Sequence, residues 1–222
     1  MDDYLSEKEQ WEAVKAGVRE YGGWIIAGIA VGAAVLGGYR WYQDHRDHVG
    51  AEASQKYAQV AAAFERNDRT QALTLLGELE RDYSSSPYVD QAHLLAARSY
   101  VAGGELDQAA KDLQSVASNS KDADLALIAR MRLARVQIAE KKADDALTTL
   151  NGAKPGAFAP EYYEVMGDAY YAKGNKSEAL KNYTMARASD LGSFASNPQL
   201  DLKITDLAVE NTPLASDTPH AK

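Results

Sequence analysis

The apolar stretch GGWIIAGIAVGAAVLGGYRWY, residues 22–42, constrains the fold of this chain more than any other feature. The nineteen residues from Tyr21 to Tyr39 carry no formal charge. As an α-helix they extend over about 28 Å, close to the ~30 Å hydrocarbon core of a bilayer. Aromatic residues, which favour the membrane interface, lie at both ends: Tyr21, Trp24, Tyr39, Trp41 and Tyr42. The pattern predicts a transmembrane helix over residues 21–42.

A buried core helix and a cleaved export signal are the two alternatives for this stretch. A core helix usually has a polar stripe, whereas this segment is apolar all round. Residues 1–20 hold six acidic and three basic residues, unlike the positive start of a signal peptide. The small-x-small triplet at Ala51-Glu52-Ala53 lies about ten residues past the apolar run, too far for normal cleavage. An uncleaved single-pass anchor is therefore favoured.

Charge does not orient this anchor, because three basic residues lie on each side: Lys8, Lys15 and Arg19 before it, and Arg40, Arg46 and Lys56 after it. Gly28 and Gly32 form a G-x-x-x-G pattern within the span. Small residues at this spacing let another membrane helix approach closely. Gly28 and Gly32 are therefore predicted to contact a partner helix, although glycine is also common in spans without such a role.

The rest of the chain is typical of a folded, acidic domain. The whole chain has a net charge of −8, which gives no reason to expect nucleic-acid binding, since this usually needs a basic face. The absence of cysteine excludes disulfides, thiolate metal sites and cysteine nucleophiles.

A helical repeat begins after residue 50. Four segments share a turn, a polar pair and an alanine, and their aligned alanines are Ala72, Ala109, Ala146 and Ala179, spaced by 37, 37 and 33 residues. This period is typical of the tetratricopeptide repeat, a helix-turn-helix of about 34 residues. The sequence therefore predicts an all-α chain with a solenoid of about four helix pairs. Gly167 and Ala179 are expected where two helices cross.

The predicted repeat domain covers residues 43–210 and ends in a capping helix that starts at about Asn197 or Pro198. Such a cap is needed because the last repeat otherwise exposes an apolar face. Residues 211–222 are predicted to be a disordered tail.

Stacked repeats build a concave surface from the first helix of each pair, and this surface is the candidate partner-binding groove. Equivalent positions across the repeats predict that these residues line it: Arg98, Arg135 and Asp168, with Val101, Ile138 and Tyr171 one turn on, and Tyr57 from the helix before the first turn. The alternative is that several of them are ordinary surface residues.

No catalytic, nucleotide or cofactor motif stands out, and we expect neither enzymatic activity nor a cofactor. His45 and His48 are three residues apart and permit a metal site, but a solvated linker after the span is the simpler interpretation. An enzyme with an unrecognised site is the remaining alternative.

Several segments together resemble the YfgM family: QWEAVK at 10–15, the end of the span GYRW at 38–41, Tyr57, and RLARVQ at 132–137. The similarity runs from about residue 4 to residue 209. This chain departs from the usual pattern by a longer polar tail after residue 210.

The resemblance implies an ancillary subunit of the bacterial Sec translocon. It implies a cytoplasmic N-terminal segment at 1–20, one span of the inner membrane and a periplasmic repeat domain. The partners implied are the SecYEG translocon, a periplasmic chaperone of the PpiD type and newly translocated polypeptides. The resemblance also implies a link to envelope stress control. An adaptor for another envelope complex, such as one for cell-wall or cytochrome maturation, is the alternative.

Overall fold

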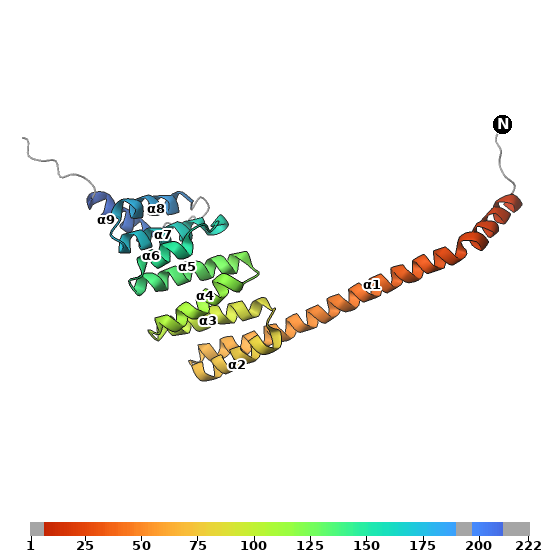
Figure 1. Cartoon of the computed structure of the whole chain (residues 1–222), viewed down its shortest axis with the longest axis horizontal. Helices are drawn as coiled ribbons and strands as arrows, with labels where there is room; N and C mark the ends of the chain where they lie inside the picture. Colours follow the sequence, from red (N-terminus) through yellow and green to blue (C-terminus); the bar gives the residue numbers. More distant parts are fainter. Residues whose placement is uncertain (1–6, 190–196, 211–222) are drawn as a thin grey trace, which may run out of the picture. The chain divides into compact units, whose positions relative to one another are not determined.

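The computed structural model describes residues 7–189 and 197–210, and every regular element in these ranges is a helix (Figure 1). The predicted tail at 211–222 lies outside the described residues. The elements are α1 (Glu7–Glu65), α2 (Arg69–Tyr83), α3 (Pro87–Ala102), α4 (Leu106–Asn119), α5 (Ala123–Ala139), α6 (Ala143–Leu150), the short 3-10 helix η1 (Gly156–Phe158), α7 (Ala159–Ala172), α8 (Lys176–Ser189) and α9 (Pro198–Glu210).

The chain divides into two compact units, Met1–Glu52 and Ala53–Lys222. In the first unit, large apolar side chains of the 22–42 stretch are exposed, for example Trp24 at 81% and Leu36 at 70%. Within the first unit itself, these side chains therefore form no packed core among the described residues. The predicted membrane boundaries at residues 21 and 42 stay a prediction.

Within the described ranges, no single helix is long and apolar enough by itself to cross a membrane. Two parts of α1, Val14–Trp24 and Ile26–Glu65, meet that criterion together and are bent by 45° at the break between them. Gly22 and Gly23 lie beside the bend. Glycine pairs are a common site of such kinks, because they lack side chains that stiffen the turn.

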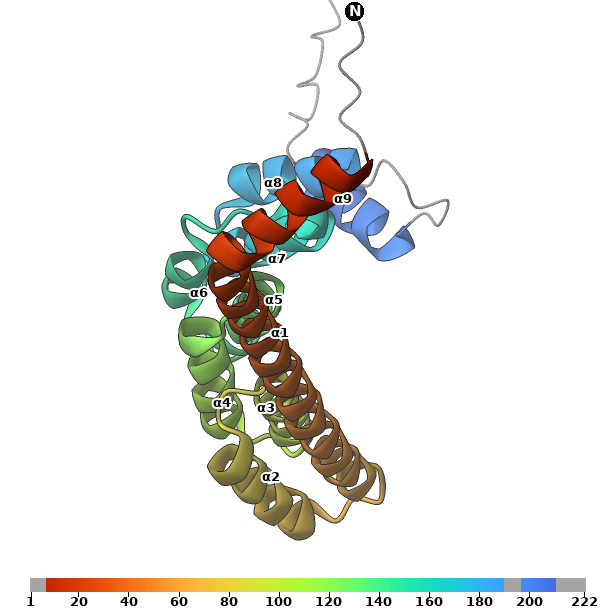
Figure 2. The same cartoon turned by 90° about the vertical axis from the view of Figure 1, so that its right-hand side faces the viewer.

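In the second unit, the helices stack in consecutive pairs, as predicted. The end of α1 precedes α2, and α3/α4, α5/α6 and α7/α8 follow (Figure 1). Figure 2 shows α4 and α6 along one edge of this stack and α3, α5 and α7 along the other. The aligned alanines are completely buried: Ala72, Ala109, Ala146 and Ala179. The predicted all-α repeat fold is therefore confirmed.

Each pair turns through one left-handed residue, and this residue recurs at the repeat period. These residues are Asn67 (φ 57°), Gly104 (φ 77°), Lys141 (φ 65°) and Gly174 (φ 85°), each five positions before an aligned alanine. The amide after each of them donates to a carbonyl five residues earlier, as Glu105 does to Tyr100 at 2.9 Å. This bonding satisfies carbonyls that the helix end leaves open. The turns are thus built alike, although only two of them use glycine.

The crossing of α7 and α8 is close at Gly167, as predicted. A Cβ atom added there would lie 2.4 Å from two carbons of the Tyr183 ring. Tyr183 is 2% exposed. The ring therefore occupies the space that a side chain at residue 167 would need.

The capping helix α9 begins at Pro198, where the sequence predicts it. Its buried residues Leu200, Ile204 and Leu207 pack against Ala179, Tyr183 and Ala186 of α8. The last repeat is thereby covered, which confirms the predicted cap.

Candidate partner-binding groove

A cavity of about 590 Å³ opens in the second unit among α1, α3, α4 and α5. Its lining is mostly apolar with three arginines, and consists of Tyr57, Gln91, Leu94, Leu95, Ala97, Arg98, Val101, Leu106, Leu113, Arg132, Arg135, Val136 and Ala139. We call this cavity the groove.

Helical periodicity places these side chains together. On α3, Leu94, Arg98 and Val101 recur at spacings of four and three, so they share one face. On α5, Arg132, Val136 and Ala139 recur in the same way. The groove therefore lies between α3 and α5, which are the first helices of two neighbouring pairs, and α4 contributes to its floor.

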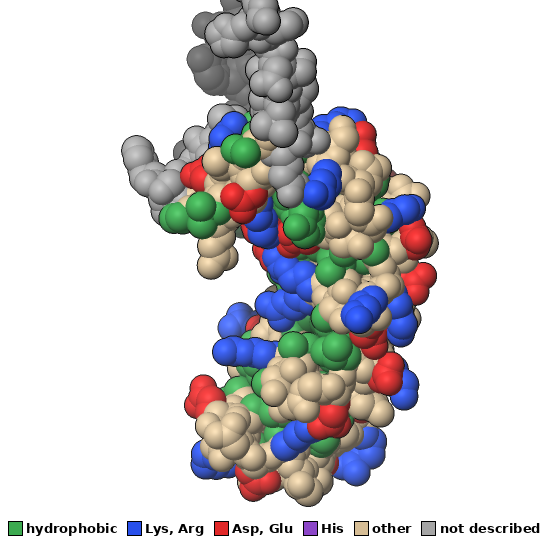
Figure 3. Space-filling model, turned by 90° about the vertical axis from the view of Figure 1, so that its left-hand side faces the viewer, with side chains coloured by type: hydrophobic (Ala, Val, Ile, Leu, Met, Phe, Trp, Pro, Cys, Tyr) green, Lys and Arg blue, Asp and Glu red, His purple; other side chains and the backbone are tan. Residues whose placement is uncertain are grey.

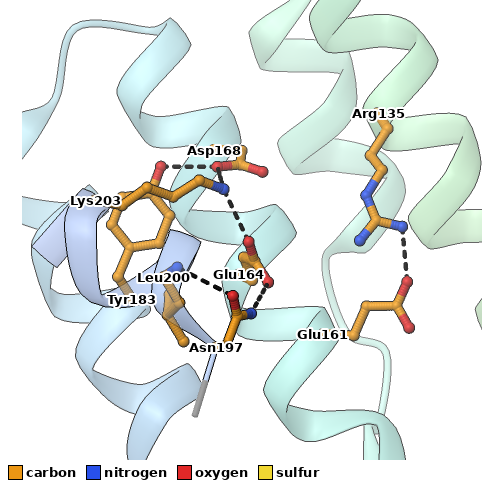
Figure 4. Close-up of polar contacts among 8 residues, drawn as sticks. All are labelled: Arg135, Glu161, Glu164, Asp168, Tyr183, Asn197, Leu200 and Lys203. Carbon is orange, nitrogen blue, oxygen red and sulfur yellow. Dashed lines mark hydrogen bonds and ion pairs between the residues drawn. The ribbon is translucent and has the colours of Figure 1, made fainter. Parts of the chain in front are cut away.

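Positive charge gathers along the groove. Arg98 and Arg132 are exposed, and neither forms an ion pair with another described residue. Arg135 donates from its guanidinium to Oε1 of Glu161 on α7 at 2.7 Å (Figure 4). Figure 3 shows a hollowed side of the repeats at which Lys and Arg side chains gather beside hydrophobic ones.

The structure brings together four of the seven predicted groove residues. Tyr57, Arg98, Val101 and Arg135 all line the cavity. Tyr57 also stacks on Tyr88, with ring centroids 5.6 Å apart. Their role in binding a partner stays a prediction.

The other three predicted groove residues, Ile138, Asp168 and Tyr171, do not line this cavity. Ile138 is partly buried and packs against the core around Met131 and Ala146. Tyr171 is 54% exposed on α7. For these residues too, a binding role stays a prediction.

Asp168 takes part in an internal network that joins α7, α8 and α9 (Figure 4). Its Oδ1 accepts hydrogen bonds from the Tyr183 hydroxyl at 2.8 Å and from Nζ of Lys203 at 2.7 Å. Lys203 also donates to Glu164 at 2.9 Å. These contacts give Asp168 a structural role at the cap.

The network changes the acid–base properties of its members. Burial by itself lowers the pKa of Lys203, but hydrogen bonds to Asp168 and Glu164 outweigh it, so that pKa is raised. Burial raises the pKa of Tyr183, and the negative charge of Asp168 raises it further. Lys203 therefore stays a cation and Tyr183 a neutral donor.

The G-x-x-x-G residues Gly28 and Gly32 lie on open surface in the first unit. A Cβ atom at either position would meet nothing within 4 Å. Within the described part of the first unit, nothing covers these two positions, and the predicted helix contact stays a prediction.

No group of three metal-ligating side chains converges anywhere in the described part of the chain. His45 and His48 are exposed, and the His45 ring stacks on Trp41 with centroids 5.8 Å apart.

Sequence reasoning missed Arg132 and the leucines of the groove. Arg132 lies one turn before Arg135, and Leu94 lies one turn before Arg98. Both residues lie on the same helix face as a predicted groove residue, so helical spacing could have identified them. Leu106 and Leu113 of α4 had no such signal, because they reach the groove only through the packing of α4 against α3 and α5.

The fold and groove define a protein of the tetratricopeptide-repeat class, and comparison with known proteins agrees. The family model described as "Tetratricopeptide repeat-like domain" matches residues 15–209. No solved structure matches the chain significantly.

Curated relatives cover nearly the whole chain. It is 29% identical over 209 residues to the "Ancillary SecYEG translocon subunit" of Escherichia coli, covering 94% of this chain and 100% of that protein. The protein of the same name from Neisseria gonorrhoeae is 31% identical over 187 residues, covering 84% and 90%. The one from Haemophilus influenzae is 25% identical, covering 91% and 98%. The chain therefore belongs to the tetratricopeptide repeat-like family of ancillary SecYEG translocon subunits, the YfgM family.

Proposed function

We propose that this chain is a membrane-anchored, non-enzymatic adaptor that associates with the SecYEG translocon. The observation that carries this proposal is the end-to-end similarity to relatives named as ancillary SecYEG translocon subunits. The family model also extends from residue 15, before the apolar stretch, to residue 209. The similarity is therefore not confined to the repeats, which are shared by many unrelated adaptors.

The anchor is proposed to be the apolar stretch of α1, crossing the bacterial inner membrane once. Its exposed apolar side chains support this placement, because a large exposed apolar patch on a soluble domain favours association. The N-terminus is proposed to lie in the cytoplasm and the repeats in the periplasm, and the family resemblance supports this orientation.

The repeats are proposed to hold a protein partner on the periplasmic side. A groove with apolar walls and exposed arginines suits the side chains of a polypeptide. We propose a chaperone of the PpiD type and newly translocated polypeptides as these partners, and the family resemblance supports them.

Co-purification from native membranes tests this function. Full-length tagged protein is isolated in mild detergent, and its companions are quantified by mass spectrometry against a single-pass protein with an unrelated periplasmic domain. Enrichment of SecY, SecE and SecG over that control is expected. Enrichment of another envelope complex instead, without translocon subunits, would refute the proposed association.

A further inference from the structure

The groove has an unusual combination of surfaces: an apolar floor with guanidinium groups along its edge. The floor is formed by buried side chains such as Leu94, Leu113 and Val136. Val101 extends this apolar surface into solvent, since it is 45% exposed. A ligand that binds here must therefore supply apolar groups of its own.

The length of the groove favours a polypeptide. The lining residues of α3 run from Gln91 to Val101, a stretch of eleven residues with ten rises between them and hence about 15 Å of helix. This length corresponds to about four or five residues of an extended chain, or nearly three turns of a helix.

The charge along the groove is of one sign. The charged residues among its lining are Arg98, Arg132 and Arg135, and no acidic residue lines it. Arg98 and Arg132 have no ion-pair partner among the described residues. These two guanidinium groups are therefore available to a carboxylate from outside, which they can bind with strong, charge-assisted hydrogen bonds.

The neighbouring Arg135 shows how such a carboxylate binds. Glu161 of α7 reaches it with an N–H···O distance of 2.7 Å between heavy atoms (Figure 4). An incoming acidic side chain beside Arg98 or Arg132 would form the same kind of contact in the groove.

We infer that the groove recognises a polypeptide segment in which apolar residues are flanked by aspartate or glutamate, and that it discriminates against basic segments. This inference rests on the proposed adaptor function and adds the chemistry of its partner. The chain is acidic as a whole, with a net charge of −8, so the attraction is local to the groove.

Fluorescence anisotropy tests the inference with the full-length protein in detergent. The probe is a labelled 12-residue peptide whose central leucine and phenylalanine are flanked by glutamates. Two comparison peptides replace the glutamates by lysine, or the leucine and phenylalanine by serine. The glutamate probe is expected to bind at least about tenfold more tightly than either, and more weakly in 500 mM than in 50 mM NaCl, because salt screens exposed charges.

The variant Arg98→Glu/Arg132→Glu is expected to weaken binding of the glutamate probe at least about tenfold. The milder variant Arg98→Gln/Arg132→Gln should weaken binding less. It replaces the charge-reversal variant in the test if charge reversal perturbs folding. The matched control is Lys111→Glu/Lys154→Glu, which makes the same change in net charge at two exposed lysines outside the groove. It should leave binding within about twofold.

Several results would overturn the inference: no binding of the glutamate probe, equal binding of the lysine peptide, or equal loss in the control. Dimers that dissociate in the arginine variants would also overturn it, since a second copy would then occupy the groove.

Co-purification with SecYEG is measured separately, so that failure of the inference can be told from failure of the adaptor function. Probe binding without translocon enrichment would refute the adaptor function alone, and the reverse result would refute the groove's specificity alone.

Discussion

At the scale of single residues, two local arrangements bring neighbouring helices into contact. One is the absence of a side chain at Gly167, which lets the Tyr183 ring lie against α7. The other is His93 of α3, whose Nε2 lies 2.5 Å from Oε1 of Glu80 on α2 and whose Nδ1 lies 3.3 Å from Oδ1 of Asp112 on α4. Each acts at a crossing between neighbouring helices.

The substitution Gly167→Ala is expected to destabilise the second unit by about 1–3 kcal/mol, because the new methyl group overlaps the buried Tyr183 ring. This overlap outweighs the gain in helix propensity, about 1 kcal/mol. The matched control is Gly77→Ala on α2, where a Cβ meets nothing within 4 Å. It should stabilise by about 0.5–1 kcal/mol. Thermal unfolding followed by circular dichroism measures both, and equal effects would contradict the close crossing.

His93 makes stability depend on pH. Burial by itself lowers the pKa of His93, but the hydrogen bond to Asp112 and the charge of Glu80 outweigh it, so the folded-state pKa is raised above 6.5. The protonated form is therefore stabilised by folding. This stabilisation is fully present below pH 6.5 and is lost as pH rises through the raised folded-state pKa.

The variant His93→Gln is accordingly expected to cost about 1–2 kcal/mol at pH 6, and less at pH 9. This is at the low end for hydrogen bonds to charged groups, about 1.5–3 kcal/mol, because Glu80 is partly exposed. Denaturant unfolding at the two pH values measures the difference. His48→Gln, at an exposed histidine in the first unit, is the control for loss of an imidazole. A cost that is equal at both pH values, or larger at pH 9, would contradict the role of the charged form.

At the scale of elements, the cap α9 is held by polar contacts as well as by its apolar face. Lys203 reaches both Glu164 and Asp168 of α7, and its Nζ lies 5.3 Å from the centroid of the Tyr183 ring on α8. Because these partners come from two helices, Lys203 fixes where α9 lies on the last repeat.

The substitution Lys203→Met keeps the aliphatic stem but removes the ammonium group. We expect a local loss of about 1 kcal/mol, reduced from the value for a buried charged contact because a third of the side chain is exposed. Amide hydrogen exchange of residues 198–210 should then be about fivefold faster. Lys181→Met, at an exposed ion pair within α8, is the control and should change this exchange little. Unchanged exchange in Lys203→Met would show that the apolar face alone holds α9.

The repeat elements were predictable from the sequence because small residues recur where helices touch. Ala72, Ala109, Ala146 and Ala179 mark the buried face, and Pro198 marks the start of the cap. The left-handed turn at Lys141 was not apparent from residue type, since lysine rarely takes this conformation. Its place is set by the repeat period instead.

The candidate site was predictable only in part. Arg98 and Arg135 follow from equivalent positions in two repeats, and both line the groove. Asp168 occupies the same repeat position, but Lys203 and Tyr183 engage it. Its partner Lys203 lies 35 residues along the chain, so local pattern does not reveal the contact.

At the scale of the whole molecule, two surfaces are proposed to act separately. The apolar stretch of α1, with Gly28 and Gly32 on open surface, is proposed to contact membrane partners. The groove in the second unit is proposed to hold a polypeptide on the periplasmic side. Substitutions in one surface are therefore expected to leave binding at the other surface unchanged.

Association with the translocon is proposed to occur through the span, and quantitative co-purification of matched variants tests this contact. Gly28→Leu/Gly32→Leu adds bulk to the proposed contact face. Ala30→Leu/Ala34→Leu adds bulk about 200° around the helix, on the opposite face, and is the control. SecY recovery with the glycine variant is expected to fall at least about fivefold, while the control retains most of it. Equal recovery of SecY with all three proteins would refute the contact through the span. No enrichment of SecY with the wild type would refute the association itself.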